Sequence, residues 1–248
     1  MSRLAEMLQQ EFMLRAFAGT ALVALLCSYV GVFVVLRRAV FVGAALAQIS
    51  SLGVAVALLL CGCWGESAHG ELPWLAHPLA FILSVGAALV FAAQPRERRL
   101  SREAIIGIGY AAAGALVILT VAISAGAEAQ AVNLLFGNVL TITWQDIYGL
   151  VALGVAVGGM HAAFFKEFLL VSFDPEMAQA LGMRARRWNG LLFLTVGLTV
   201  AGTIRAAGAL VVFAFLVLPA ASGLLLATTL QRVLLFAVLT GLLCAVSG

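Results

Sequence analysis

Long apolar runs, separated by short clusters of arginines, constrain the fold of this 248-residue chain more than any other feature. Hydrophobic residues make up 64% of the sequence and charged residues only 10%, so a soluble domain of this composition would expose large apolar patches. Runs of about 20 apolar residues can cross a bilayer as helices, and these runs lack the alternation typical of barrel strands. The sequence therefore predicts an all-α, polytopic transmembrane helix bundle.

The apolar runs predict about eight spans in a single transmembrane domain that covers residues 1–248. The spans are expected at residues 12–36, 40–60, 75–93, 104–125, 147–165, 188–204, 206–226 and 233–248. The head segment before the first span has no small-residue cleavage site and is interpreted as a short interfacial helix. The chain ends inside an apolar run, which predicts that a C-terminal segment is missing.

The placement of Lys and Arg predicts the orientation, because loops rich in these residues stay on the cytoplasmic side. The odd-numbered connections between spans hold 11 of them, and the opposite side holds three, Arg3, Arg15 and Arg205. The N-terminus is therefore expected outside. Arg205 is interpreted either as a side chain that reaches the outer headgroups or as part of the outer mouth of a pathway, where it would oppose cation entry.

The charged residues also argue against several classes of membrane protein. All 11 carboxylates fall in the head segment, in loops or at span ends, so the sequence shows no buried ionisable relay of the kind that ion-coupled carriers need. Lys166 is the single lysine, and no glycine-rich phosphate-binding loop is present. Any ATP must therefore bind to another subunit, and no catalytic constellation marks this chain as an enzyme.

The longest of the arginine-bearing connections predicts a short surface helix. Asp174 is a favoured N-cap, Pro175 suits the first helical position, Glu176 is acidic in the first turn, and Gly182 favours a stop. One interpretation is a coupling helix that docks on a motor subunit. The alternative is a capped interfacial helix whose basic end lies near anionic lipid.

Four sequence blocks, spread over nearly the whole chain, carry a family resemblance: GVFVVLRRAVFVGAALAQISSLGVA, LLFGNVLTITWQDIY, SFDPEMAQALGM and GALVVFAFLVLPAAS. In this order and spacing they resemble the membrane permeases of bacterial zinc, manganese and iron ABC importers, the ABC-3 type. The resemblance implies a type II ABC importer fold in the bacterial plasma (inner) membrane. It also implies a homodimer or paired permease, cytoplasmic ATPase subunits that bind the ATP, and an extracytoplasmic substrate-binding protein. No cofactor on this chain and no nucleic-acid partner is expected.

The resemblance assigns the ATPase contact to the residues of the predicted surface helix. These are Asp174, Pro175, Glu176, Ala178 and Gly182.

The second span departs from the pattern of the family it resembles. Manganese and zinc members generally carry Gly-Asp-x-x-x-His there, and this spacing places Asp and His on one helix face that suits a divalent metal. In this chain Ala44 stands at the Asp position and Gln48 at the His position. An amide is a weak, neutral ligand, so the sequence favours a passage lined by polar side chains such as Gln48 and Ser51 over a tight metal site. The alternative role for Gln48 is a hydrogen bond between helices.

Two other polar groups are weaker candidates. Thr195, Thr199 and Thr203 form one hydroxyl stripe along the sixth span, and Thr199 is a pathway candidate, although such threonines usually bond their own backbone. The loop between the second and third spans carries acidic and imidazole groups that could attract a metal. These weak metal candidates are His69, Glu71 and His77.

The sequence thus leads to one expected function and two alternatives. The expected function is the permease subunit of an ATP-driven ABC importer for divalent metal ions (zinc, manganese or iron), which works by alternating access. The first alternative keeps this machinery but imports a metal chelate or a small organic molecule, since positions 44 and 48 lack Asp and His. The second alternative is a secondary carrier or a membrane scaffold that transports nothing.

Overall fold

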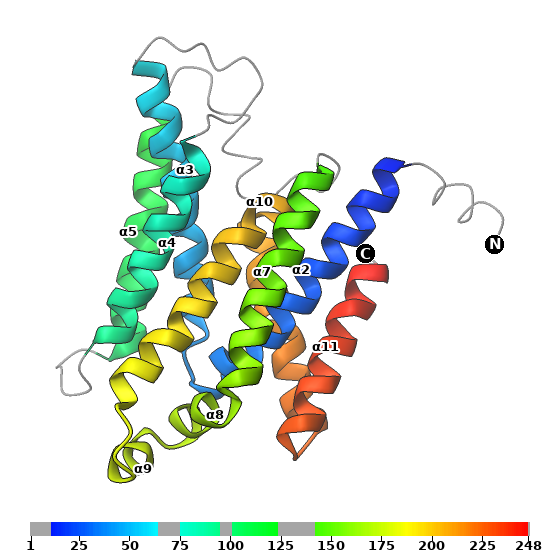
Figure 1. Cartoon of the computed structure of the whole chain (residues 1–248). Helices are drawn as coiled ribbons and strands as arrows, with labels where there is room; N and C mark the ends of the chain where they lie inside the picture. The colour runs from blue at the N-terminus through cyan, green and yellow to red at the C-terminus, as the bar shows by residue number, and fades with distance from the viewer. Residues whose placement is uncertain (1–10, 64–74, 95–100, 124–141, 248) are drawn as a thin grey trace.

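The computed structural model describes residues 11–63, 75–94, 101–123 and 142–247. Within these residues every regular element is a helix, and Figure 1 shows a bundle of long helices with the short helices α8 (Phe165–Phe173) and α9 (Pro175–Ala180) at one end. Six helices are long and apolar enough to cross a membrane, and a shorter apolar helix spans Pro78–Ala93. The predicted all-α polytopic bundle is confirmed.

The long helices follow the predicted spans closely over the first half of the chain. They are α2 (Glu11–Leu36), α3 (Phe41–Cys63), α4 (Ala76–Ala93), α5 (Arg102–Ile123), α7 (Trp144–Ala163), α10 (Ala185–Leu226) and α11 (Leu230–Ser247). The expected interfacial helix of the head segment lies outside the described residues. The separate helix α8, which follows directly on α7, is not among the predicted elements.

The start of α7 shows why hydropathy misplaces a helix end. The apolar run predicts a start at residue 147, yet the helix begins at Trp144 because Thr143 and Asp146 form a capping box. The Asp146 amide donates to Thr143 Oγ1 at 3.3 Å, and the Thr143 amide donates to Asp146 Oδ2 at 3.0 Å. These bonds satisfy backbone donors that would otherwise be left open at the first turn. Polar capping, not apolar character, therefore sets this end.

The division between the sixth and seventh expected spans lies three residues beyond Arg205. The two expected spans form one continuous element of 42 residues, α10, which remains helical through Arg205 and breaks at Gly208. Gly208 has φ 79° and ψ 163°, a backbone conformation that residues with a Cβ rarely adopt. Conformational freedom at a glycine, rather than the charge at Arg205, therefore determines where the chain bends.

Contacts with α2 show that the two parts of α10 run in opposite directions. Leu192 packs in one cluster with Phe33, and the carbonyl of Leu216 lies directly against Gly31. A straight helix would separate Leu192 from Leu216 by about 36 Å, whereas their partners on α2 are only two positions apart. The chain must therefore double back at Gly208, as Figure 1 shows, and α10 supplies both of the expected passages.

Small residues allow the central helices to pack closely. A Cβ added at Gly31 would overlap the carbonyl oxygen of Leu216, and one added at Gly241 would overlap Ser28 Oγ. At Gly223 it would lie 2.6 Å from the carbonyl oxygen of Val233. Helices in lipid associate through close packing of this kind, because the acyl chains are as apolar as the side chains and the hydrophobic effect does not favour helix–helix contact. The α2–α10–α11 packing therefore depends on these glycines.

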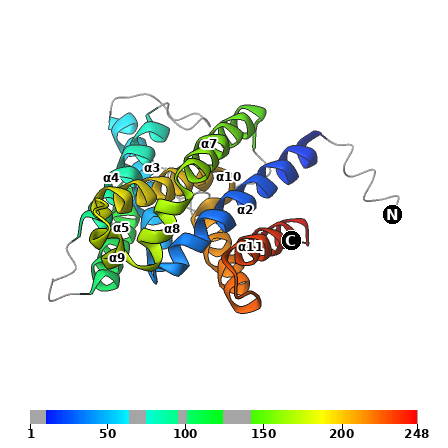
Figure 2. The same ribbon diagram turned by 60° about the horizontal axis from the view of Figure 1, so that its bottom comes forward.

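The connections that carry most of the described arginines lie at one end of the bundle. In Figure 1 this is the lower end, where α2 stops, α8 and α9 lie, and α10 and α11 begin. Figure 2 brings this end forward and shows α8 beside α2. The sidedness of the charges is thus present in the fold, while the orientation relative to the cell stays a prediction.

Candidate functional site

The face of α3 that carries Ala44 and Gln48 is left partly open. Ala45, Leu46 and Ala47 are buried in the main hydrophobic core, whereas Ala44 and Gln48, one turn apart, remain half-buried. The Gln48 amide makes no hydrogen bond with the described residues. This leaves the amide available to a ligand or a second chain, and its assignment to a pathway stays a prediction.

Two serines, two and three residues after Gln48 on α3, are enclosed in the protein. Ser50 and Ser51 are fully buried, and neither hydroxyl has a hydrogen-bond partner among the described residues. A buried hydroxyl without a partner costs free energy, so native proteins contain few of them. Ser51 therefore does not line an open surface of the single chain, although its unsatisfied hydroxyl adds polar character next to Gln48.

The threonine stripe on α10 bonds mainly to its own helix. Thr199 Oγ1 donates to the Thr195 carbonyl at 2.8 Å, and Thr203 Oγ1 donates to the Thr199 carbonyl at 2.7 Å. All three side chains are fully buried. This placement supports the packing alternative for Thr199, whose role in a pathway stays a prediction.

One polar residue of this region was missed by the sequence reasoning. His161, on α7, is fully buried, and its Nε2 lies 3.0 Å from Thr195 Oγ1 on α10. Its ring packs against Tyr29, Phe33 and Phe168, and its Nδ1 has no hydrogen-bond partner among the described residues. The expectation that no ionisable group is buried within a span is therefore incomplete. An imidazole inside an apolar run is itself the signal that could have identified it.

An open pocket of about 450 Å³ lies between α4, α7 and α10. Its lining is largely apolar, with Gln145, Asp146 and Arg205 as the polar exceptions. The Arg205 guanidinium lies 3.2 Å from the Asp146 carboxylate. Arg205 thus lines a pocket and is paired with a carboxylate. The two interpretations from the sequence, a side chain that reaches the headgroups and a cation in the mouth of a pathway, did not include this carboxylate.

The capped helix predicted in the long connection is present as α9. Asp174 Oδ1 accepts from the amides of Glu176 at 3.0 Å and Met177 at 2.9 Å, and Pro175 takes the first turn. The helix ends at Ala180, and Gly182 has φ 77°, which suits a helix stop. Ala178 is the buried side chain of α9 and packs against Val171 and Ala185.

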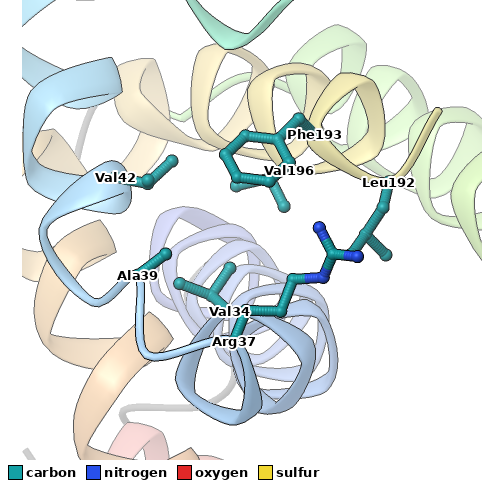
Figure 3. A pocket seen from close by; sticks show the side chains of 7 residues that line it. All are labelled: Val34, Arg37, Ala39, Val42, Leu192, Phe193 and Val196. Atoms are coloured by element: carbon teal, nitrogen blue, oxygen red, sulfur yellow. The ribbon is translucent and has the colours of Figure 1, made fainter. Parts of the chain in front are cut away.

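At the same end of the bundle, the side chain of Arg37 joins three helices. Nη2 donates to the Val171 carbonyl at 2.7 Å, Nε donates to Ser172 Oγ at 3.2 Å, and Nη1 donates to Asn189 Oδ1. Figure 3 shows this side chain beside a cavity of about 10 Å³, with Phe193 and Leu192 on the α10 side. A cavity of this size holds one water at most.

The proposed external metal loop is not described. His69 and Glu71 lie outside the described residues, and His77 falls at the start of α4 without a described side chain. Among the residues that the structure does describe, no three His, Cys, Asp or Glu side chains come together as a metal centre. The three weak metal candidates stay predictions.

Comparison with known proteins gives consistent results over the whole chain. Residues 9–248 match the ABC 3 transport family. The manganese transport system membrane protein MntC of Halalkalibacterium halodurans is 28% identical over 98% of this chain and 79% of its own length. A probable metal transport system membrane protein of Treponema pallidum is 30% identical over 88% of this chain and 77% of its own.

Two solved structures share the fold. PsaBC from Streptococcus pneumoniae in complex with Fab matches with a TM-score of 0.80 at 24% identity, over 99% of this chain and 84% of the other. An inward-facing putative metal-chelate type ABC transporter matches with a TM-score of 0.71 at 20% identity, over 94% and 75%. The match to residues 9–248 shows the family directly: this chain belongs to the ABC 3 transport family.

Proposed function

We propose that this chain is the membrane-spanning permease subunit of an ATP-driven importer of divalent metal ions. Family membership over residues 9–248 and manganese-transport relatives across nearly the whole chain support the transport role. The observation that carries the ATP-driven part is α9, a capped helix at the arginine-bearing end of the bundle.

The two sides of α9 differ as a docking helix requires. On the side facing the bundle, Ala178 is fully buried. On the outer side, Met177 is 55% exposed and Leu181 63% exposed, and Phe173 just before the cap is 61% exposed. An anchored helix with exposed apolar side chains outside the spans fits the surface groove of a partner. We assign this surface to a cytoplasmic ATPase subunit, which would bind the ATP.

The cargo assignment depends on α3. Manganese and other hard cations accept neutral oxygen ligands, and the half-buried Gln48 amide can supply one. Because Ala44 and Gln48 lie on a half-open face of α3, a second copy of the chain would complete a passage between the two copies there. This passage would open to one side of the membrane at a time, which is alternating access. We therefore propose a homodimer, with weak oxygen ligands along the route rather than a tight metal site.

The same observation favours a second candidate. Without a carboxylate at 44 or an imidazole at 48, the face suits a cargo that brings its own ligands, such as a metal chelate or a small organic molecule. In either case the N-terminus lies outside the bacterial inner membrane, where a substrate-binding protein would deliver the cargo. No cofactor on this chain and no nucleic acid takes part.

Cargo-stimulated ATP hydrolysis tests the proposal. The permease is reconstituted with its ATPase and binding protein in vesicles and challenged with Mn²⁺, Zn²⁺, Fe²⁺ and their chelates. Stimulation by a free ion supports the metal importer, and stimulation by chelates alone supports the second candidate. No stimulation by any cargo, in a complex that hydrolyses ATP, would contradict both.

A matched pair of variants sharpens the cargo test. Ala44→Asp with Gln48→His restores the pattern of the metal-transporting members and should strengthen binding of Mn²⁺ to the detergent-solubilised permease. Gly158→Ala serves as the control, because a Cβ there meets nothing within 4 Å. A restored pair that binds no more Mn²⁺ than this control would exclude the Ala44–Gln48 face as a metal route.

A further inference from the structure

Arg37 occupies the place where the docking helix meets the transmembrane helices. It follows directly on α2, and its guanidinium binds α8 through the Val171 carbonyl at 2.7 Å and Ser172 Oγ at 3.2 Å. It also binds Asn189 Oδ1 on α10, and its Cζ lies 5.8 Å from the centre of the Phe193 ring. A planar fork with several fixed donors can hold such an arrangement, whereas a single ammonium cannot.

The partners of Arg37 are themselves tied to further helices. Asn189 is 9% exposed, and its Nδ2 donates to the Ala92 carbonyl near the end of α4 at 2.7 Å. Val171, whose carbonyl accepts from Arg37, also packs against Ala178, the buried side chain of α9. One packed side chain, Val171, therefore lies between α9 and Arg37, and Asn189 connects Arg37 to α10 and α4.

The backbone after Arg37 leads directly into the pathway helix. The connection from α2 to α3 is closed by backbone hydrogen bonds from Arg38 to Val35 at 2.9 Å and from Ala39 to Val34 at 3.2 Å. Arg38 itself has φ 54°, in the left-handed region that residues with a Cβ seldom adopt, and this conformation makes the corner tight. The amide of Val42 in the first turn of α3 donates to the Ala39 carbonyl at 3.0 Å, so a short, hydrogen-bonded corner joins Arg37 to α3, the helix of Ala44 and Gln48.

We propose that Arg37 is a positioning residue that couples the ATPase-docking helix α9 to the α2–α3 corner, and so to the Ala44–Gln48 face. This inference rests on the proposed function, because it assigns the route by which ATPase movement reaches the pathway. Docking or release of the ATPase moves α9 and α8, and the bonds of Arg37 make α2, α3 and α10 follow. The packed side chains at this end of the bundle form the contiguous network that such coupling needs, and their second arrangement is assigned to the change in ATPase docking.

Adjacent arginines provide a matched experiment. Arg37→Lys keeps the charge and loses the fork, while Arg38→Lys makes the same change at an exposed neighbour. Each variant is reconstituted with the ATPase and binding protein, and three quantities are measured: assembled complex, basal ATP hydrolysis, and cargo moved per ATP. Arg37→Lys should lower cargo moved per ATP about tenfold, within the usual range of coupling between sites, with basal hydrolysis and assembly retained. Arg38→Lys should match the wild type.

A milder variant covers the case in which Arg37→Lys does not fold. Ser172→Ala removes one acceptor of Arg37 and keeps the helix, so it should assemble and show a smaller loss of cargo per ATP. A merely structural role would lower the amount of complex and leave this ratio unchanged. The inference would be overturned if both Arg37→Lys and Ser172→Ala moved as much cargo per ATP as the wild type. If Arg37→Lys yields no complex, a wild-type value for Ser172→Ala alone would overturn it. In either case the proposed function would stand. A wild-type complex without ATP-driven uptake would overturn both.

Discussion

The Arg205 guanidinium lies 3.2 Å from the Asp146 carboxylate, which joins α10, three residues before its break at Gly208, to the capped first turn of α7. The Asp146 side chain is 17% exposed and the Arg205 side chain 48% exposed. An ion pair this open to solvent adds at most about 1 kcal/mol to stability. Under the proposed function, its main effect is therefore on the charge that this pocket presents to a cation.

Removing the charge of Arg205 and removing the charge of Asp146 should change cation uptake in opposite directions. Arg205→Gln leaves the Asp146 carboxylate to attract cations and should lower the half-saturating metal concentration, whereas Asp146→Asn leaves the guanidinium and should raise it. Initial rates of Mn²⁺ uptake at low and high salt measure the effect, which salt should diminish. The double variant serves as the control and should return close to wild type. Equal shifts of the same sign would contradict a charge effect.

Closing the space at Gly31 should destabilise the bundle. Gly31→Ala forces a Cβ into the Leu216 carbonyl, and overpacking of this kind costs roughly 1–3 kcal/mol. The midpoint of thermal unfolding in detergent should fall by several degrees. Gly158→Ala, made in open space on α7, is the matched control and should change little. Equal midpoints for the two variants would show that α2 and α10 are not in backbone contact.

The buried bond between α7 and α10 can be separated from the rest of the threonine stripe. Thr195→Val leaves the His161 ring without its partner in an apolar setting, at a cost of about 1–3 kcal/mol. Thr199→Val loses a bond to its own helix and should cost far less. Unfolding midpoints of the two variants test this difference. Uptake by the Thr199→Val protein tests the pathway role, because a normal rate would assign Thr199 to packing.

Gln48 should affect transport more than stability. Its amide is half-buried and has no hydrogen-bond partner among the described residues, so Gln48→Ala breaks no bond within them. Uptake should change while the yield of folded permease stays the same. Thr240→Val on α11, a polar-to-apolar change on an exposed helix face, controls for a general effect. Normal uptake by the Gln48→Ala protein would remove this residue from the pathway.

The N-cap of α9 should contribute to ATPase binding. Asp174→Ala removes an acceptor for two backbone amides and costs about 1 kcal/mol, or roughly fivefold in affinity if the cap orders the docking helix. Asp174→Ser retains a capping oxygen and is the conservative control. Co-purification of the ATPase at limiting concentration measures the loss. Unchanged recovery with Asp174→Ala would place the docking surface elsewhere.

Local patterns account for most of what could be predicted. The apolar runs placed the first spans to within a few residues, and the sequence Asp-Pro-Glu identified the start of α9, because hydropathy and capping act over a single turn or a single span. The start of α7 and the break in α10 each lie three residues from the predicted position, because a capping box and a positive-φ glycine took precedence over hydropathy. His161 was missed for a related reason, since one imidazole hardly changes the mean hydropathy of its run.

The sequence by itself therefore determined the class of protein, the passages through the membrane, the capped helix α9 and the substitution of Ala44 and Gln48 in the expected metal pattern. Only the tertiary structure decided how α10 folds back onto α2, which hydroxyls remain unsatisfied, and that Arg37 binds α8 and α10. These features join residues far apart in the chain, such as Arg37 with Asn189, 152 positions later. Their distances depend on how helices pack, which no local pattern encodes.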